Sequence, residues 1–271
     1  MLFAALTLAM PLLAGALIAL LGSALGERCA RIGIWALAVS AGAALLALAQ
    51  TILHDPVLQS LPAIPAAWSP ALFVDRLAAV MMVLITGVSL VIHAYSQRYM
   101  HDDPGYVRFF SLLSLLTFAL LTLVTSGNLL WMGVSWNLIT WILASLLAFN
   151  RKNPEAQHAG RRTLWIQGIG DAAFAGAVAV LYLAYGTLNL KDLGDRLQED
   201  PVRLGFGSGV DAPVLATLLL LLSVVTKSAQ FPFHLWLAGT IEAPTPVSAL
   251  LHAGIVNAGG FLVNRLAFLF G

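Results

Sequence analysis

A series of long apolar segments constrains this chain more than any other feature. A helix needs roughly 20 apolar residues to cross the ~30 Å hydrocarbon core of a bilayer. Runs of this length without strict alternation favour helices over a membrane barrel, and only 10% of the 271 residues are charged. The segments are residues 2–22, 32–53, 72–95, 107–125, 129–148, 163–185, 213–237 and 245–269. The sequence therefore predicts an all-α integral membrane protein with about eight transmembrane helices.

The basic residues of the loops predict the orientation, because lysine and arginine collect on the cytoplasmic side. One set of alternate loops holds Arg28, Arg31, Arg98, Arg108, Arg151, Lys152, Arg161 and Arg162. The opposite set holds Arg76, Lys191, Arg196 and Arg203, which acidic residues dilute. We therefore expect a multi-pass protein of the cell inner (cytoplasmic) membrane, with both the N-terminus and the C-terminus outside.

Two longer loops are expected on the outer side. Residues 54–71 contain four prolines and predict an extended segment with little helix. Residues 186–211 are polar, and the stretch NLKDLGDRLQED within them predicts a short helix on the membrane surface.

Lys227 is the most unusual residue of these segments. It follows the uncharged run TLLLLLSVVT, and a charge in hydrocarbon costs roughly 3 kcal/mol. A lysine stretched to the cytoplasmic interface is one interpretation, and an ionisable group in a polar pocket is the favoured one. Pro232 is expected to break the seventh helix and to free carbonyls near Ser228. Such a break is tolerated at membrane depth where it lines a cavity or is buried in protein.

Asp171, in the sixth segment, is the expected partner of Lys227. An unpaired carboxylate at this depth is as costly as the lysine, so the two side chains are predicted to lie close together. A protonated carboxyl, or one that caps a helix kink, is the alternative. Gly168 and Gly170 are expected to permit close approach of a neighbouring helix.

Other polar residues leave more than one interpretation open. His252 suits a proton relay or simple packing, and Glu242 suits an ion path or a solvated loop. Asn137 cannot titrate, so an interhelical hydrogen bond is favoured. Asp75, His93 and His234 lie near segment ends, where an interfacial role is favoured. The six histidines are scattered and Cys29 is the single cysteine, so neither a metal site nor a catalytic site is expected in this chain.

Five motifs follow one another in an order that matches a known family. They are GNLLWMGVSWN, IGDAAFA, YGTLNLKDL, TKSAQFPFHLWL and EAPTPVSALLHAG. Together they resemble the antiporter-like subunits of respiratory complex I and of multisubunit cation/proton antiporters (NuoL- and MrpA-like). The resemblance implies that Lys227 is the family's central lysine on a broken seventh helix. The expected ion-translocation residues are Lys227, Asp171, His252 and Glu242, supported by Asn137, Ser228, Pro232 and Asn257.

The sequence departs from the family pattern in two ways. Asn137 stands where the family has a glutamate, which removes the acid usually thought to tune the lysine. The family is built from two inverted five-helix repeats. Residues 107–271 resemble the first repeat, after three N-terminal helices in residues 1–106, and the second repeat is absent. Either the sequence is a truncated form or a partner supplies the other half-channel.

Within the family, the stretch LLHAGIVNAGGFLVNR, which includes Asn257, is most similar to DabB, the membrane subunit of inorganic-carbon accumulation complexes. The resemblance implies a DabA-like partner with a zinc site similar to β-carbonic anhydrase, and ion flow that drives CO2 hydration to bicarbonate. A proton-pumping subunit of complex I or of an Mrp-type antiporter is one alternative, and a non-conducting membrane anchor for a cytoplasmic enzyme is another. The net charge of +1 gives no basis for a nucleic-acid partner.

Overall fold

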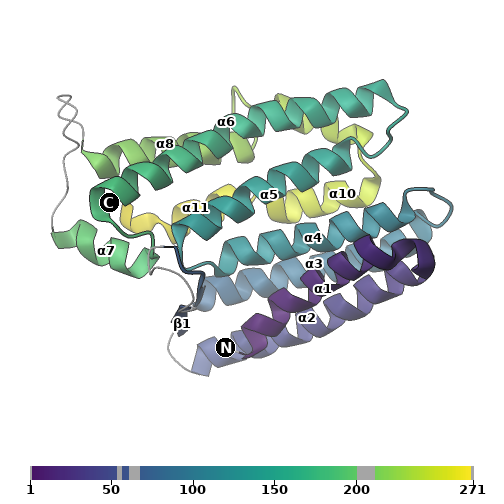
Figure 1. Ribbon diagram of the computed structural model, residues 1–271, viewed down its shortest axis with the longest axis horizontal. Coiled ribbons are helices and arrows are strands. Elements are labelled where there is room, and N and C mark those ends of the chain that lie inside the picture. Colours follow the sequence, from purple (N-terminus) through teal and green to yellow (C-terminus); the bar gives the residue numbers. More distant parts are fainter. Residues whose placement is uncertain (1, 54–56, 61–67, 200–210, 270–271) are drawn as a thin grey trace.

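The computed structural model describes residues 2–53, 57–60, 68–199 and 211–269, and its long helices lie side by side with both termini at one end (Figure 1). Seven helical spans in this part of the chain are long and apolar enough to cross a membrane. They are α1 (Leu2–Leu25), α2 (Arg28–Leu53), α3 (Arg76–Tyr99), α4 (Tyr106–Thr125), α5 (Leu129–Leu147), α6 (Pro154–Tyr185) and an interrupted helix from Thr245 to Arg265. The shorter apolar helix α8 (Ala212–Lys227) supplies the remaining predicted segment.

Three helices begin four or more residues away from the predicted starts, and the first of them is α2, which begins at Arg28 instead of residue 32. The third predicted segment started at residue 72, but α3 begins at Arg76 because Asp75 caps it, with Oδ1 accepting from the Ala78 N–H at 2.8 Å. The sixth predicted segment started at residue 163, whereas α6 begins at Pro154 behind the capping residue Asn153. Proline suits the first helical turn, where its missing N–H costs nothing. The first turns of α6 therefore carry Arg161 and Arg162, which had been assigned to a loop.

The seventh segment is broken, as predicted, but the break starts before Pro232. Helix α8 ends at Lys227, and Ala229 takes a left-handed conformation with φ of 52°. The Gln230 N–H then bonds to the Val225 carbonyl at 3.0 Å, which is the Schellman pattern of helix termination. The chain resumes in α9 (Leu235–Ala238) and the 3₁₀ helix η1 (Gly239–Glu242). Pro232 lies inside the break and does not start it.

The eighth segment is interrupted by one wide turn. It consists of α10 (Thr245–Leu250), the π-turn η2 (Leu251–Ile255), α11 (Ala258–Arg265) and the 3₁₀ helix η3 (Ala267–Leu269). Within the π-turn the Val256 N–H bonds to the Leu251 carbonyl at 3.0 Å, five residues back. The wide turn frees carbonyls, and the Asn257 side chain donates to those of His252 and Ala253 at 3.0 and 3.5 Å.

Short elements close the end of the bundle where the termini lie (Figure 1). Strand β1 (Val57–Ser60) pairs antiparallel with β2 (Ala71–Val74), so the described part of the chain is helical apart from this two-stranded ribbon. Helix α7 (Leu190–Glu199) confirms the predicted short helix. Residues 54–56 and 61–67 of the proline-containing loop, and residues 200–210 with Arg203, lie outside the described part of the chain.

Helix α4 lies at the centre of the bundle, and 67% of the residues in its most apolar 18-residue stretch are buried. Against it packs His93 of α3, which is fully buried. Its Nδ1 is 2.9 Å from the Ser89 carbonyl and its Nε2 is 3.1 Å from the Ser114 hydroxyl. The predicted interfacial place for His93 is therefore wrong, because α3 continues to Tyr99 and carries His93 inside the bundle.

Candidate functional site around Lys227

The Lys227 side chain is fully enclosed at the end of α8. Four oxygen atoms surround its ammonium group. They are Trp136 O at 2.9 Å, Thr140 Oγ1 at 2.6 Å, Gln167 Oε1 at 3.2 Å and Asp171 Oδ1 at 3.4 Å. The ammonium also lies 4.9 Å from the centre of the Trp136 ring, within the range of a cation–π contact. The prediction of a buried polar pocket for Lys227 is confirmed.

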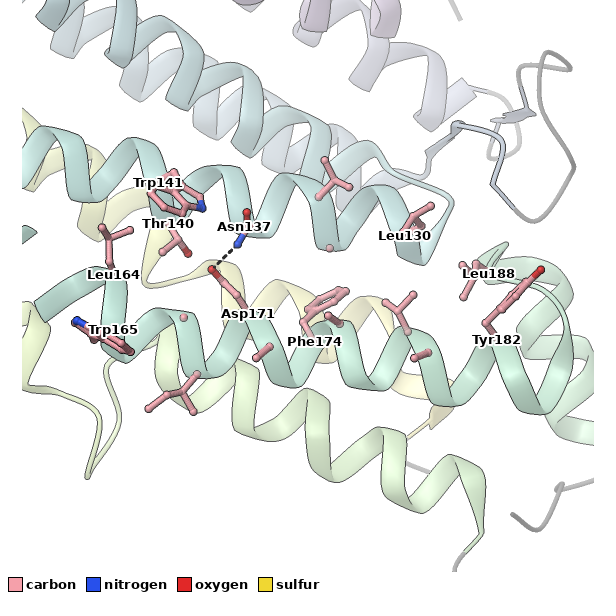
Figure 2. A pocket seen from close by; sticks show the side chains of 18 of the residues that line it. Leu130, Asn137, Thr140, Trp141, Leu164, Trp165, Asp171, Phe174, Tyr182 and Leu188 are labelled. Carbon is pink, nitrogen blue, oxygen red and sulfur yellow. Dashed lines mark hydrogen bonds between the residues drawn. The ribbon is translucent and has the colours of Figure 1, made fainter. Parts of the chain in front are cut away.

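Asp171 joins Lys227 to Asn137. Its Oδ1 forms the ion pair with Lys227, and its Oδ2 accepts a hydrogen bond from the Asn137 amide at 3.0 Å (Figure 2). The lysine and aspartate side chains are only 1% and 7% exposed. The predicted proximity of Asp171 and Lys227 is confirmed, and so is the interhelical hydrogen bond of Asn137. An amide at position 137 donates to the carboxylate, whereas a second carboxylate there would repel it.

Glycine at position 170 lets α6 and α8 approach closely enough for this ion pair. A Cβ atom at Gly170 would lie 1.8 Å from Thr226 Oγ1 and 3.3 Å from Ser223 Cα, well inside contact distance. A Cβ atom at Gly168 would meet nothing within 4 Å. Of the two glycines predicted to permit helix contact, only Gly170 lies at the contact with α8.

The ion pair borders a large pocket between α5 and α6. The pocket has a volume of about 1240 Å³ and a mostly apolar lining, with Asn137, Thr140 and Asp171 among its polar members. In Figure 2 the Asn137–Asp171 bond lies part-way along the pocket, between Trp165 near one end and Tyr182 near the other. Trp165 is 79% exposed, so the pocket opens on the outer surface of the chain. Asp171 can therefore be reached from the side of the helix pair.

Several polar atoms near Lys227 have no hydrogen-bond partner among the described residues. They are Trp136 Nε1, Gln167 Nε2 and Ser223 Oγ. Trp136 and Gln167 each place another atom on the lysine ammonium, and Ser223 lies one turn earlier on α8. Buried polar groups without a protein partner are typical attachment points for ordered water.

Comparison with known proteins identifies the family. The protein family described as "NADH:quinone oxidoreductase/Mrp antiporter, TM" matches residues 126–271. The family described as "NADH-Ubiquinone oxidoreductase (complex I), chain 5 N-terminus" matches residues 66–110. The chain belongs to the NADH:quinone oxidoreductase/Mrp antiporter family. It is thus an antiporter-like, multi-pass membrane subunit, and the family resemblance seen in the sequence is confirmed.

Two curated relatives of this antiporter-family chain bear different names. The chain is 38% identical to the "Probable inorganic carbon transporter subunit DabB1" of Halothiobacillus neapolitanus, over 96% of its own length and 46% of that protein. It is 39% identical to the "NADH-quinone oxidoreductase subunit L" of Neisseria meningitidis, over 74% of its length and 31% of that protein. The chain therefore spans less than half the length of either relative.

Solved structures agree on the fold. A chain of the Mrp complex from Dietzia sp. superposes with a TM-score of 0.81 at 27% identity, covering 97% of this chain and 28% of that one. A chain of an archaeal membrane-bound sulfane sulfur reductase gives a TM-score of 0.83 at 21% identity, covering 98% of this chain and 53% of that one. The antiporter-type helix arrangement is thus shared between respiratory and antiporter complexes.

Three other predicted site residues of this antiporter-family chain make no hydrogen bond to the ion pair in the described structure, namely His252, Glu242 and Ser228. His252 is exposed on the π-turn. Glu242 is half-buried, and its Oε2 accepts from the Asn153 amide at 2.8 Å, next to the start of α6. Ser228 donates to the Val256 carbonyl at 2.9 Å and so ties the end of α8 to the interrupted helix.

Two contributors to the Lys227 site were missed from the sequence. Thr140 and Gln167 look like ordinary helix polar residues, but the structure joins them at 3.2 Å and places both on the ammonium. The spacing of Thr140 and Gln167 from Asn137 and Asp171 is the sequence feature that could have indicated their place at the site. Thr140 follows Asn137 by three residues and Gln167 precedes Asp171 by four, so each pair shares one helix face.

A second ion pair, in which the arginine is buried and the aspartate partly buried, was also missed. Arg265 is 7% exposed, and its guanidinium forms two hydrogen bonds of 3.0 Å with the Asp75 carboxylate. It also donates to the Val124 carbonyl at 3.3 Å, and so links α11 to the start of α3 and the end of α4. Asp75 therefore has a structural partner as well as its capping role. Among the described residues, no three His, Cys, Asp or Glu side chains lie close enough together to hold a metal ion.

Proposed function

We propose that this chain is an ion-translocating membrane subunit that moves protons through the Lys227 site, with Asp171 as the counter-charge. The observation that supports the proposal best is the buried ion pair at a helix end inside the membrane-spanning bundle. Ionisable groups at such depth are costly and mark ion pathways and proton relays. The Thr140 hydroxyl both accepts from the ammonium and donates to Gln167, so it can hydrogen-bond either protonation state of the lysine.

The pocket between α5 and α6 is the proposed access route. It reaches Asp171, and the unpartnered polar atoms of Trp136, Gln167 and Ser223 offer positions for water around the ion pair. In this proposal Glu242 lies where the pathway meets the end of the bundle. His252 then relays the proton on the exposed side of the interrupted helix, toward a second half-channel. The corresponding division of the chain is three N-terminal helices in residues 1–106 and a first five-helix repeat in residues 107–271.

The similarity to a DabB1 protein supports a more specific role in inorganic carbon transport. In this role, ion flow through the chain drives CO2 hydration to bicarbonate in a DabA-like partner that carries a zinc site. The proposed contact is the end of the bundle with exposed Arg98, Arg151 and Arg161. The excess of basic residues there supports a cytoplasmic orientation of that end, with the N-terminus outside the inner membrane.

Proton flux through the purified complex in lipid vesicles, with a pH-sensitive dye inside, tests the ion-translocation proposal. We expect Lys227→Ala to abolish flux while the complex still assembles. Lys227→Arg keeps a cation beside Asp171 but does not deprotonate at accessible pH, so it should also abolish flux. Lys191→Ala, at an exposed site on α7, is the matched control and should conduct normally. Full flux in Lys227→Ala would refute the proposal, and full flux in Lys227→Arg would reduce Lys227 to a fixed charge.

A non-conducting membrane anchor is the second candidate function. One observation favours the anchor. In the described chain, Asp171 is the only titratable side chain that contacts the Lys227 ammonium. An absence of proton flux in vesicles with the wild-type complex would support the anchor.

Purification of the tagged chain from its native host distinguishes the remaining roles by the proteins that are recovered with it. A large zinc protein would support the inorganic-carbon role, quinone-reducing subunits a complex I role, and an active cation exchanger an Mrp role.

A further inference from the structure

A groove runs between α1 and α2, on a part of the chain that the Lys227 site does not use. Its volume is about 740 Å³. The α2 side is formed by residues spaced three and four apart, which places them on one helix face. They are Arg28, Arg31, Ile32, Trp35, Ala36 and Val39. The facing side of α1 is apolar throughout, and it includes Leu13 and Leu17, which are 62% and 41% exposed.

Two arginines lie at one end of this groove. Arg28 and Arg31 are both exposed, and neither has a hydrogen bond or an ion pair with any residue in the described part of the chain. The adjacent carboxylate of Glu27 is directed elsewhere, 3.0 Å from His101 Nε2. The two guanidinium groups are therefore free to bind an anion, and their planar donor pattern matches phosphate.

The length of the groove fits one leaflet of a bilayer. From Arg28 to Val39 the α2 side rises roughly 16 Å, and from Met10 to Leu25 the α1 side rises roughly 22 Å, at 1.5 Å per residue. Both sides are shorter than the ~30 Å hydrocarbon core, and the α2 side is about half of it. A transmembrane helix of a partner would extend along the whole core, whereas lipid acyl chains end near the midplane. Cationic residues at the mouth of an apolar groove between two membrane helices are typical of anionic lipid recognition.

We propose that the α1–α2 groove binds an anionic phospholipid. Arg28 and Arg31 hold its phosphate, and the apolar faces of α1 and α2 hold its acyl chains. Trp35, which is 72% exposed, follows Arg31 by one turn and flanks the glycerol region. This site is independent of the proposed ion pathway, because none of its residues contacts Lys227 or Asp171.

Native mass spectrometry of the purified full chain, titrated with phosphatidylglycerol or phosphatidylcholine, tests the proposal. We expect tighter binding of phosphatidylglycerol to the wild-type chain. The double variant Arg28→Gln, Arg31→Gln should weaken that binding about 30-fold, since each basic residue near an anionic surface contributes about fivefold. The matched control is Arg161→Gln, Arg162→Gln, which removes two exposed arginines of α6 and should leave the affinity unchanged.

A second variant tests the apolar part of the site without touching its charges. Leu17→Trp fills the groove at an exposed position and should also weaken lipid binding by tenfold or more, with thermal stability maintained. An equal loss of phosphatidylglycerol affinity in the two double arginine variants would overturn the proposal in favour of general charge attraction. Displacement of the lipid by inorganic phosphate alone would overturn it in favour of a simple anion site. Loss of a co-purifying protein instead of lipid from the Arg28→Gln, Arg31→Gln variant would identify the groove as a protein interface.

Discussion

Replacing Gly170 by alanine should disrupt the contact that brings the ion pair together. The added Cβ would lie 1.8 Å from Thr226 Oγ1 and 3.0 Å from Thr226 Cβ. Threonine is β-branched and stiff at χ1, and its hydroxyl already donates to the Ser223 carbonyl at 2.8 Å. The Thr226 side chain cannot move away from the added Cβ without losing this hydrogen bond, and the two helices cannot separate without losing their packing. Overpacking of this kind costs about 1–3 kcal/mol.

Gly168→Ala is the matched control for this substitution. It lies on the same helix, and a Cβ atom there meets nothing within 4 Å. Both variants gain the same helix propensity, up to about 1 kcal/mol, so the difference between them isolates the overpacking. A difference of about 1–3 kcal/mol corresponds to roughly 2–12 °C in melting temperature for a chain of this size.

The assay is thermal unfolding of both variants, purified in the same detergent and followed by tryptophan fluorescence. We expect Gly168→Ala to melt at or above the wild-type temperature and Gly170→Ala to melt below it. Proton flux in vesicles should fall in Gly170→Ala alone, because separation of α6 from α8 moves Asp171 away from Lys227. Equal melting temperatures for the two variants would refute the argument that close packing at Gly170 positions the ion pair.

Three further predictions concern other contacts. Ala229→Gly should raise the free energy of unfolding by about 0.5–1 kcal/mol, because glycine adopts the observed φ of 52° without strain; a lower melting temperature would contradict this. Arg265→Ala should lower it by roughly 2 kcal/mol or more, because the partly buried Asp75 carboxylate loses two hydrogen bonds, and an unchanged unfolding curve would show that the pair is dispensable. The His101 pKa is raised above its usual 6.5 by the hydrogen bond to Asp102 and by the charge of Glu27. Its contribution to stability should therefore be complete below pH 6.5 and disappear as pH rises through the raised pKa. Melting curves of wild type and His101→Gln should differ at acidic pH and converge at alkaline pH, and a gap that widens with pH would reverse the sign.

The membrane-spanning segments could be predicted well because hydrocarbon acts on each residue separately. The predicted and observed boundaries of α4 and α5 agree to within one residue, since both helices end where polar or small residues begin. The starts of α3 and α6 were misplaced because capping by Asp75 and Asn153 is a local hydrogen-bond effect that hydropathy does not register. The place where α8 ends was also missed, since termination at Ala229 uses a residue that gives no sequence signal for a left-handed turn.

By itself, the sequence determined that Lys227 and Asp171 need compensation, because a buried charge is costly wherever its helix lies in the membrane. Only the tertiary structure decided which groups supply that compensation. Thr140, Gln167 and the Trp136 carbonyl surround the ammonium because of the rotation and closeness of α5, α6 and α8. Gly168 and Gly170 look equivalent in the sequence, yet two residues correspond to about 200° around a helix. One glycine therefore faces the open pocket and the other faces α8, a difference that packing between helices fixes and that no single segment encodes.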